Sequence, residues 1–239
     1  MTTLFISDLH LDEARPRVVE LFEHFLAHEA RRADALYILG DLFEAYIGDD
    51  DDSPLPARVA SALKTLSESG VPVSFIAGNR DFLLGEDYAR RAGMSLLADG
   101  VVVDLCGTPT LLLHGDTLCT DDAAYLAFRK QVRDPAWQRQ FLSQSLAARH
   151  AFARQARNAS REHTSQAAMT IMDVNPHAVE AALHAAHVTR MIHGHTHRPA
   201  IHDFAVDGAP AQRIVLGDWY EQGSVLRVDP DAVELTALK

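Results

Sequence analysis

Short apolar segments rich in β-branched residues recur along the chain, and the early ones alternate with helical patterns. Several are continuous apolar runs, which is typical of strands buried on both faces. They cover residues 3–7, 35–39, 71–77, 101–105, 110–114, 188–193, 214–217 and 224–228. Residues 17–30 and 56–69 repeat apolar side chains every three or four positions, which predicts amphipathic helices. This alternation predicts an α/β fold, and the later strands, which follow one another directly, predict a mixed sheet.

Residues 121–170 interrupt this alternation. They contain no glycine, a single proline at Pro135 and no strand pattern, which predicts two to four helices with a break or a helix start at Asp134-Pro135. We therefore expect a core of residues 1–120 and 171–239 and an inserted helical cap of residues 121–170. Eight basic and four acidic side chains give the insert a net charge of +4 in a chain of −11. Such a basic island indicates an anionic partner, and solvated helix faces are the alternative interpretation.

Composition excludes several classes of protein. No apolar run reaches the roughly 18–20 residues that a membrane span needs. The N-terminus lacks the basic region of a secretory signal, and the two cysteines, Cys106 and Cys119, fit a reducing cytoplasm. A net charge of −11 argues against nucleic acid as a partner that is bound by bulk charge. The run Gly48-Asp-Asp-Asp-Asp52 is predicted to be a solvated loop.

Polar segments follow five of the predicted strands. Any one of them is common in turns, but strand ends of an open α/β sheet converge on one edge, where ligands bind. The segments are Asp8-Leu9-His10, Gly40-Asp41, Gly78-Asn79-Arg80-Asp81, His114-Gly115-Asp116 and Gly194-His195-Thr196-His197. So many imidazoles and carboxylates in one cleft would leave polar groups without partners, and a pair of metal ions resolves this. The predicted ligands are Asp8, His10, Asp41, Asn79, His114, His195 and His197.

The donor set predicts the kind of metal. Two aspartates, four histidines and one asparagine, with no thiolate, suit Mn²⁺ or iron, and Zn²⁺ remains an alternative. Asp41 is the predicted bridging carboxylate. Two ions about 3.5–4 Å apart can hold a hydroxide between them and stabilise both the attacking and the leaving oxygen of a phosphoryl displacement.

The ordered motifs resemble those of the calcineurin-like metallophosphoesterases, and the match runs from Asp8 to His197. The resemblance implies a β-sandwich flanked by helices with two metal ions at one edge. One position departs from the usual pattern, because Arg80 stands where most of these proteins have histidine after Gly-Asn. The structural alternative for Arg80 is a simple ion pair with Asp81.

Arg80 and three longer stretches, residues 113–122, 171–175 and 193–199, are similar to one branch, the UDP-2,3-diacylglucosamine diphosphatases of bacterial lipid A synthesis. The resemblance covers essentially the whole chain. It implies two Mn²⁺ ions, with hydrolysis of the substrate's pyrophosphate by a two-metal-activated hydroxide to UMP and 2,3-diacylglucosamine 1-phosphate. It also implies a cytoplasmic enzyme that is peripheral on the inner face of the cell inner membrane. Arg129 and Arg133 are the side chains expected to face that membrane surface.

The resemblance further implies substrate contacts. It assigns catalytic roles to Arg80 and Asp41 and substrate contacts to Asn79, Arg80, Asp122, Ser160, Thr164 and His195. Ala167 stands where relatives often have lysine, so Arg157 or Arg161 is the expected replacement. The cap is expected to take up acyl chains, and a small core of its own is the alternative. Two other functions stay open: a soluble nucleotide phosphodiesterase or phosphatase on the same fold, and a binding module without metals.

Overall fold

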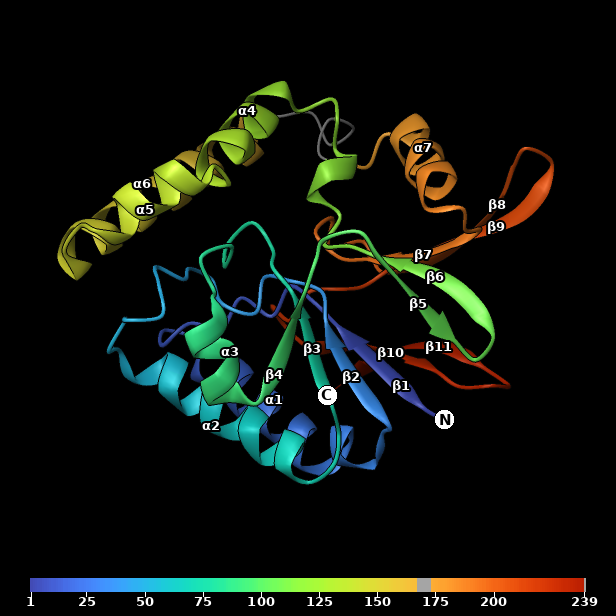
Figure 1. Ribbon diagram of the computed structural model, residues 1–239, viewed down its shortest axis with the longest axis horizontal. Coiled ribbons are helices and arrows are strands. Elements are labelled where there is room, and N and C mark those ends of the chain that lie inside the picture. The colour runs from blue at the N-terminus through green and yellow to red at the C-terminus, as the bar shows by residue number, and fades with distance from the viewer. Residues whose placement is uncertain (167–172, 239) are drawn as a thin grey trace.

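The computed structural model describes residues 1–166 and 173–238 and contains two mixed β-sheets (Figure 1). The α/β class and the mixed pairing predicted from the sequence are both confirmed. In the first sheet β1 (Thr3–Ile6), β2 (Ala35–Ile38), β3 (Val73–Ile76) and β4 (Met94–Leu97) run parallel. The strands β10 (Gly223–Val228) and β11 (Val233–Leu238) extend it antiparallel beyond β1.

Three helices cover the outer face of this sheet (Figure 1). They are α1 (Pro16–His28), α2 (Pro54–Glu68) and α3 (Glu86–Ala92), with the short 3-10 helix η1 (Ala30–Arg32) after α1. Each long helix begins with proline in its first turn, where the missing N–H costs no hydrogen bond. Their buried side chains, such as Phe22, Phe25 and Leu63, pack with the sheet in the largest apolar cluster.

The second sheet has the order β5 (Val101–Leu105), β6 (Thr108–Leu112), β7 (Arg190–His193), β9 (Ala209–Val215) and β8 (Ala200–Val206). Phe5, Leu39 and Ile76 of the first sheet pack on Ile192 and Ile214 of the second in a buried core between the sheets. The helix α7 (Pro176–Ala186) packs on the second sheet in a separate cluster. Because β1, β2, β3, β6 and β7 are buried between layers, their ends can deliver polar side chains to one edge.

Three helices form the cap, which lies across the top of the view in Figure 1. They are α4 (Ala123–Val132), α5 (Pro135–Leu142) and α6 (Leu146–Gln166). Asp134 accepts hydrogen bonds from the amides of Ala136 and Trp137, so the predicted helix start at Asp134-Pro135 is confirmed. Phe141 joins the main apolar cluster, with Trp137 and Phe152 packed against it, so these apolar side chains of the cap pack on the core.

Arginines fasten the cap to the core, which corrects two interpretations of charge. Arg149 is 2% exposed, contacts Asp50 through both terminal nitrogens and donates to the carbonyl of Ile47. His150 lies 3.7 Å from Asp51. The acidic run at residues 48–52 is therefore not a free solvated loop, because it is the site where α6 is anchored.

The other end of the cap is held in the same way. Arg129 donates to Asp116 and Asp99, and Arg133 donates to the carbonyls of Ala77 and Gly78. The prediction that Arg129 and Arg133 face a membrane is therefore wrong, since their guanidinium groups bind core residues. Among the residues that the structure describes, no helix is long and apolar enough to cross a membrane.

Candidate metal centre

All seven predicted ligands lie at the ends of strands from both sheets. Asp8 and His10 follow β1, Asp41 follows β2, and Asn79 follows β3. His114 follows β6, and His195 and His197 follow β7. Asp8, His10, Asp41 and His114 are buried, whereas Asn79, His195 and His197 are half-buried. At this edge the side chains that follow β1, β2 and β6 are thus buried, whereas those that follow β3 and β7 are partly exposed to solvent.

One end of the cluster is formed by Asp8, His10 and His197. The Nε2 atoms of the two histidines lie 3.3 Å apart. Oδ1 of Asp8 lies 3.3 Å from Nε2 of His197 and 4.0 Å from Nε2 of His10. These three donor atoms converge on one point and could hold a metal ion.

The other end is formed by Asn79, His114 and His195. Oδ1 of Asn79 lies 2.9 Å from Nε2 of His114 and 3.0 Å from Nδ1 of His195. Nδ1 of His114 lies 2.8 Å from the carbonyl of Leu39, which leaves Nε2 as the nitrogen that faces the cluster.

Asp41 stands between the two ends. Its Oδ2 lies 3.8 Å from Nε2 of His10, and its Oδ1 lies 3.8 Å from Nε2 of His114. Asp8, Asp41 and His114 also form a second group able to hold an ion, so Asp8 borders both groups. Asp41 thus has one carboxylate oxygen toward each end, and its predicted role as a bridge depends on this arrangement.

The donor atoms have the chemistry of a metal site. Oδ2 of Asp8 accepts from Ser7 Oγ and from the amide of His195, and its buried Oδ1 lies beside imidazole nitrogens, 3.3 Å from Nε2 of His197. Buried carboxylate and imidazole donors without a thiolate suit hard or borderline cations. Metal–ligand bonds of about 2.1 Å place neighbouring donors about 3–3.5 Å apart, and the donor separations at the two ends run from 2.9 to 4.0 Å. Oxygen and imidazole donors therefore surround two points where cations would satisfy them.

The backbone is strained at these residues. Asp8, His10, Asp41, His195 and His197 all have a φ between 50° and 69°, in the left-handed region that side chains other than glycine rarely adopt. Each such residue costs of order 1 kcal/mol or more, and such strain concentrates at functional sites. The left-handed backbone conformation directs these five side chains toward one another. Sequence patterns do not indicate this strain.

Neighbouring glycines leave room for the carboxylates. A Cβ at Gly78 would lie 2.2 Å from Oδ1 of Asp41, and a Cβ at Gly194 would lie 2.3 Å from Oδ2 of Asp8. Both contacts are closer than any side chain tolerates. The Gly-Asn and Gly-His pairs of the motifs are thus steric requirements of the two aspartates.

Burial and the mutual charges shift the pKa values of the cluster. Burial disfavours the charged form of Asp8, but His197, His114 and His10 outweigh it and hold the pKa of Asp8 well below its usual range. Burial likewise opposes protonation of His114, yet Asp41 and Asp8 raise its pKa to about 9. Burial, with His114 nearby, lowers the pKa of His195 to about 4. Asp8 is therefore negative and able to bind a cation.

Several residues that the motifs did not reveal support the ligands. Oε2 of Glu44 lies 2.8 Å from Nδ1 of His10, and Oδ2 of Asp218 lies 3.5 Å from Nδ1 of His197. Asp81 is fully buried and accepts from the amides of Gly78, Leu42 and Asp41. The ring of Tyr220 stacks on His10 with centroids 5.2 Å apart. Asp81 could have been identified from its position in Gly78-Asn-Arg-Asp81. Glu44, Asp218 and Tyr220 lie in no short metal-ligand pattern.

Two of the predicted substrate contacts, Arg80 and Ser160, lie together, and a third, Asp122, lies at the start of α4. Arg80 Nη2 donates to Ser160 Oγ across 3.3 Å, so these two residues meet between the metal edge and α6. Both oxygens of Asp81 are taken by backbone amides, so the alternative of an Arg80–Asp81 ion pair is not what the structure contains. Asp122 accepts from the amide of Tyr125 and begins α4.

The remaining substrate predictions meet the edge of the described structure. The side chains of Thr164 and Arg161, and residue Ala167, lie outside the described residues. Arg157, one expected replacement for the missing lysine, lies 2.6 Å from Oε1 of Glu44 and 3.5 Å from Oδ2 of Asp12.

This fold and site define a class of protein. The model of the calcineurin-like phosphoesterase family matches residues 1–199, and the chain belongs to that family. A solved archaeal phosphodiesterase is similar over the full length of both chains, with a TM-score of 0.50 and 12% identity, which bears on the fold alone.

Closer relatives are named for one activity. The chain is 61% identical to the UDP-2,3-diacylglucosamine hydrolase of Stenotrophomonas maltophilia strain K279a, over 100% of this chain and 99% of the relative. It is 59% identical to the protein of the same name from Xanthomonas oryzae pv. oryzae strain PXO99A, over 98% of each chain.

Proposed function

We propose that this protein hydrolyses the pyrophosphate bond of UDP-2,3-diacylglucosamine, giving UMP and 2,3-diacylglucosamine 1-phosphate in lipid A synthesis. Full-length similarity of about 60% to relatives of that name supports the substrate. The observation that carries the proposal is the position of Arg80. Its amide donates to Asp41 Oδ1 across 2.8 Å, and its guanidinium extends from there to Ser160 of the cap. The positively charged guanidinium of Arg80 thus lies between the predicted metal ligands and the cap helix α6, where the lipid half of the substrate is proposed to bind.

Two metal ions would be held by the seven ligands, with Asp41 as the bridge, and Mn²⁺ is the proposed ion because oxygen and imidazole donors suit it. When bound, the ions supply positive charge to the phosphate oxygens and an activated water. The chain itself supplies orientation. Asp81 fixes the loops that carry Asp41 and Asn79 through its hydrogen bonds to backbone amides. Arg80 offers two N–H groups to a phosphate, a geometry that a guanidinium suits.

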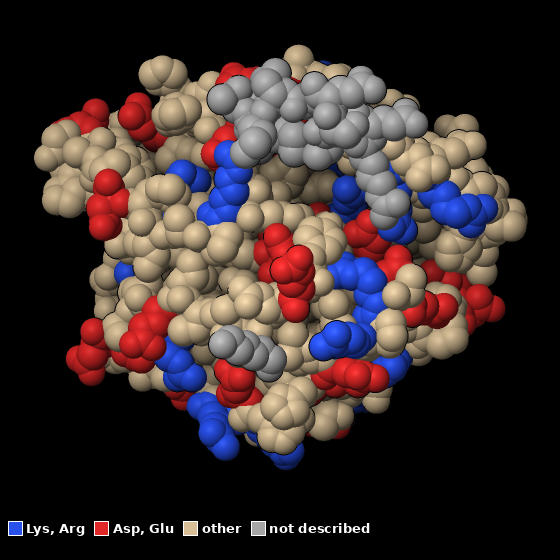
Figure 2. Space-filling view, turned by 180° about the vertical axis from the view of Figure 1, so that it is seen from behind, with Lys and Arg blue, Asp and Glu red and all other residues tan. Residues whose placement is uncertain are grey.

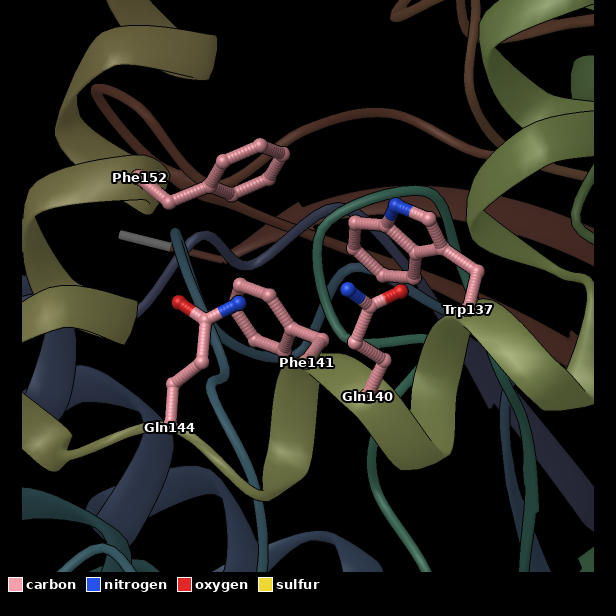
Figure 3. A pocket seen from close by; sticks show the side chains of 5 residues that line it. All are labelled: Trp137, Gln140, Phe141, Gln144 and Phe152. Carbon is pink, nitrogen blue, oxygen red and sulfur yellow. The ribbon is translucent and has the colours of Figure 1, made fainter.

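The cap supplies an apolar site for the lipid half of the substrate. Trp137, Gln140 and Phe141 of α5, Gln144 of the connection between α5 and α6, and Phe152 of α6 line a cavity of about 130 Å³ (Figure 3). The rings of Trp137 and Phe141 stack with centroids 4.9 Å apart, and Phe152 meets Phe141 edge to face. Ligand pockets usually exceed about 300 Å³. This cavity therefore suits part of an acyl chain rather than a whole substrate.

Product analysis tests substrate and reaction together. Incubation with UDP-2,3-diacylglucosamine in ¹⁸O-labelled water is expected to give UMP and the lipid phosphate, with the label in UMP. That result follows from attack on the uridine-side phosphorus. Label in the lipid phosphate would contradict the direction of attack. Hydrolysis of simple nucleotides or phosphoproteins in preference to the lipid substrate would favour a soluble phosphodiesterase or phosphatase instead.

A lipid substrate requires access to a membrane surface, and we propose peripheral association through the cap. Phe128 and Leu142 are exposed apolar side chains of the cap, and Lys130 and Arg139 are exposed beside them in the sequence. Figure 2 shows the molecule from the side opposite to Figure 1, and on that face basic and acidic side chains are interspersed rather than separated into patches of one charge. Because α4 and α5 expose both apolar and basic side chains, the cap helices are the proposed contact, with Lys130 and Arg139 in place of Arg129 and Arg133.

Binding to anionic vesicles is expected to weaken as salt rises and to fall at least about tenfold in Lys130→Glu/Arg139→Glu, since each basic side chain near the surface contributes roughly 1 kcal/mol. Vesicle co-sedimentation measures it. Arg31→Glu/Arg32→Glu, which reverses two exposed charges in η1, is the matched control and should bind as the wild type. Binding that ignores salt, or equal losses in both double variants, would contradict this contact surface.

A further inference from the structure

Glu44 touches both a predicted metal ligand and the cap. Its Oε2 lies 2.8 Å from Nδ1 of His10, and its Oε1 lies 2.6 Å from Nη2 of Arg157 on α6. The carboxylate is mostly buried, at 8% exposure. One carboxylate therefore connects the first loop of the metal edge to a helix more than a hundred residues further along the chain.

The backbone holds Glu44 in this place. After β1 and β2 end, their parallel pairing continues: the amide of His10 donates to Asp41, that of Leu11 to Leu42, and that of Glu44 to the carbonyl of Leu11. Leu11 and Phe43 form an isolated parallel bridge. The register of the two strands thus fixes the backbone of Glu44 beside His10, and the contacts of its carboxylate set the orientation of the side chain.

The contact with Glu44 decides which nitrogen of His10 faces the cluster. A neutral imidazole carries one N–H, and donating it from Nδ1 to a carboxylate leaves the Nε2 lone pair free. Nε2 is the atom that lies 3.3 Å from His197 and 3.8 Å from Asp41. Carboxylates that accept from a ligand histidine orient the ring and raise its basicity, and losing one typically costs 10–100-fold in metal affinity.

We infer that Glu44 is a positioning residue that couples docking of the cap to metal binding at His10. It orients His10 for the ion through Oε2 and binds Arg157 of α6 through Oε1. With Nε2 available to an ion, Nδ1 of His10 would carry the proton and donate it to Glu44. That hydrogen bond would hold the carboxylate in the orientation that meets Arg157. Coupling between two sites is reciprocal, so the ion stabilises the docked cap and the docked cap stabilises the ion. The inference rests on the proposed metal centre.

Mn²⁺ binding without substrate tests the first half. Free Mn²⁺ is measured by electron paramagnetic resonance during titration of the metal-free protein. Glu44→Ala is expected to weaken the affected ion about 10–100-fold, and Glu44→Gln, which keeps an acceptor oxygen, less. Glu23→Gln is the matched control, because Glu23 has the same 2.6 Å contact with an arginine, Arg58, on the outer face of the helical layer. It should bind Mn²⁺ as the wild type.

Hydrogen exchange of the amides at residues 153–160 tests the second half. Mn²⁺ is expected to slow their exchange about fivefold or more in the wild type, the low end of usual coupling between sites. Arg157→Ala should abolish this response and weaken Mn²⁺ binding only by about the same factor of five, whereas Glu44→Ala should abolish the response and weaken binding about 10–100-fold. Should Glu44→Ala fail to fold, Glu44→Gln serves in both measurements.

The outcomes separate the two proposals. A wild-type protein that binds no Mn²⁺ would overturn the metal centre. A wild type that binds two ions, together with a Glu44→Ala variant as tight as Glu23→Gln, would overturn the role of Glu44 alone. Slowed exchange that persists in Arg157→Ala would overturn the coupling to the cap.

Discussion

Asp41→Asn is expected to lower both metal occupancy and turnover, turnover by more than about tenfold. The side chain has one oxygen toward His10 and one toward His114, each 3.8 Å from an imidazole nitrogen. Its Oδ1 accepts from the amide of Arg80, so the asparagine would turn its oxygen to that amide and its NH₂ toward His10. An NH₂ group cannot bind a cation, and the negative charge that Asp41 would offer to the proposed ions is lost.

Metal analysis of the purified variant and its rate with the lipid substrate would measure the effect. Asp203→Asn is the control, since Asp203 is an exposed acid on β8 whose recorded partner is Gln212. Full activity after exhaustive chelation of the wild type would contradict the metal centre itself. Normal metal content and turnover in Asp41→Asn would contradict the bridging position alone.

Arg80→Ala is expected to remove roughly 2–4 kcal/mol of transition-state stabilisation, by analogy with the loss of an oxyanion donor, which is a fall of about 30- to 1000-fold in kcat/KM. The backbone of residue 80 is held by Asp41 Oδ1 and by the amide of Tyr46, so the substitution removes the guanidinium without freeing the loop. The guanidinium Nε is buried and makes no hydrogen bond to any described residue. It is thus placed to bind a phosphate oxygen.

The choice of arginine predicts the leaving group as well. A histidine can protonate a departing alkoxide, whose conjugate acid has a pKa of about 16, but a guanidinium cannot act as that acid. A sugar phosphate has a second pKa of about 6 and leaves without a proton, so charge stabilisation is sufficient. Arg80→Lys should recover part of the activity, because it keeps the charge but not the fork.

Steady-state rates with the lipid substrate and with an alkyl phosphate monoester would measure this preference. The wild type is expected to cleave the pyrophosphate far faster, and Arg80→Ala to reduce that difference. Equal rates on the two substrates in the wild type, or near-normal turnover in Arg80→Ala, would contradict this role of Arg80.

Local patterns predicted most of the fold. The continuous apolar runs gave β1, β2, β3, β5, β6, β7, β9 and β10 to within a few residues, except that β9 begins earlier, at Ala209. The sequence interpretation missed β4, β8 and β11 and the helices α3 and α7. The strand β8 has mostly exposed or half-buried side chains, and β11 alternates without a long apolar run, since both lie at sheet edges. Edge strands bury less, so their patterns are weaker.

The polar residues that meet at this edge, and their order along the chain, were predictable from sequence, because each follows a buried strand and that signal is local. Tertiary structure alone decided what surrounds them. Glu44 meets His10 through strand register, and Arg157 reaches Glu44 from a helix far along the chain. Arg149 of α6 binds Asp50, so the acidic run at residues 48–52, predicted to be a solvated loop, holds the cap on the core. Such contacts join residues about 30 to more than 100 positions apart, and charge alone does not fix which partners pair. Packing of the layers decides the pairing, because it determines which charged side chains are buried together. A buried charge without a partner costs too much free energy to persist.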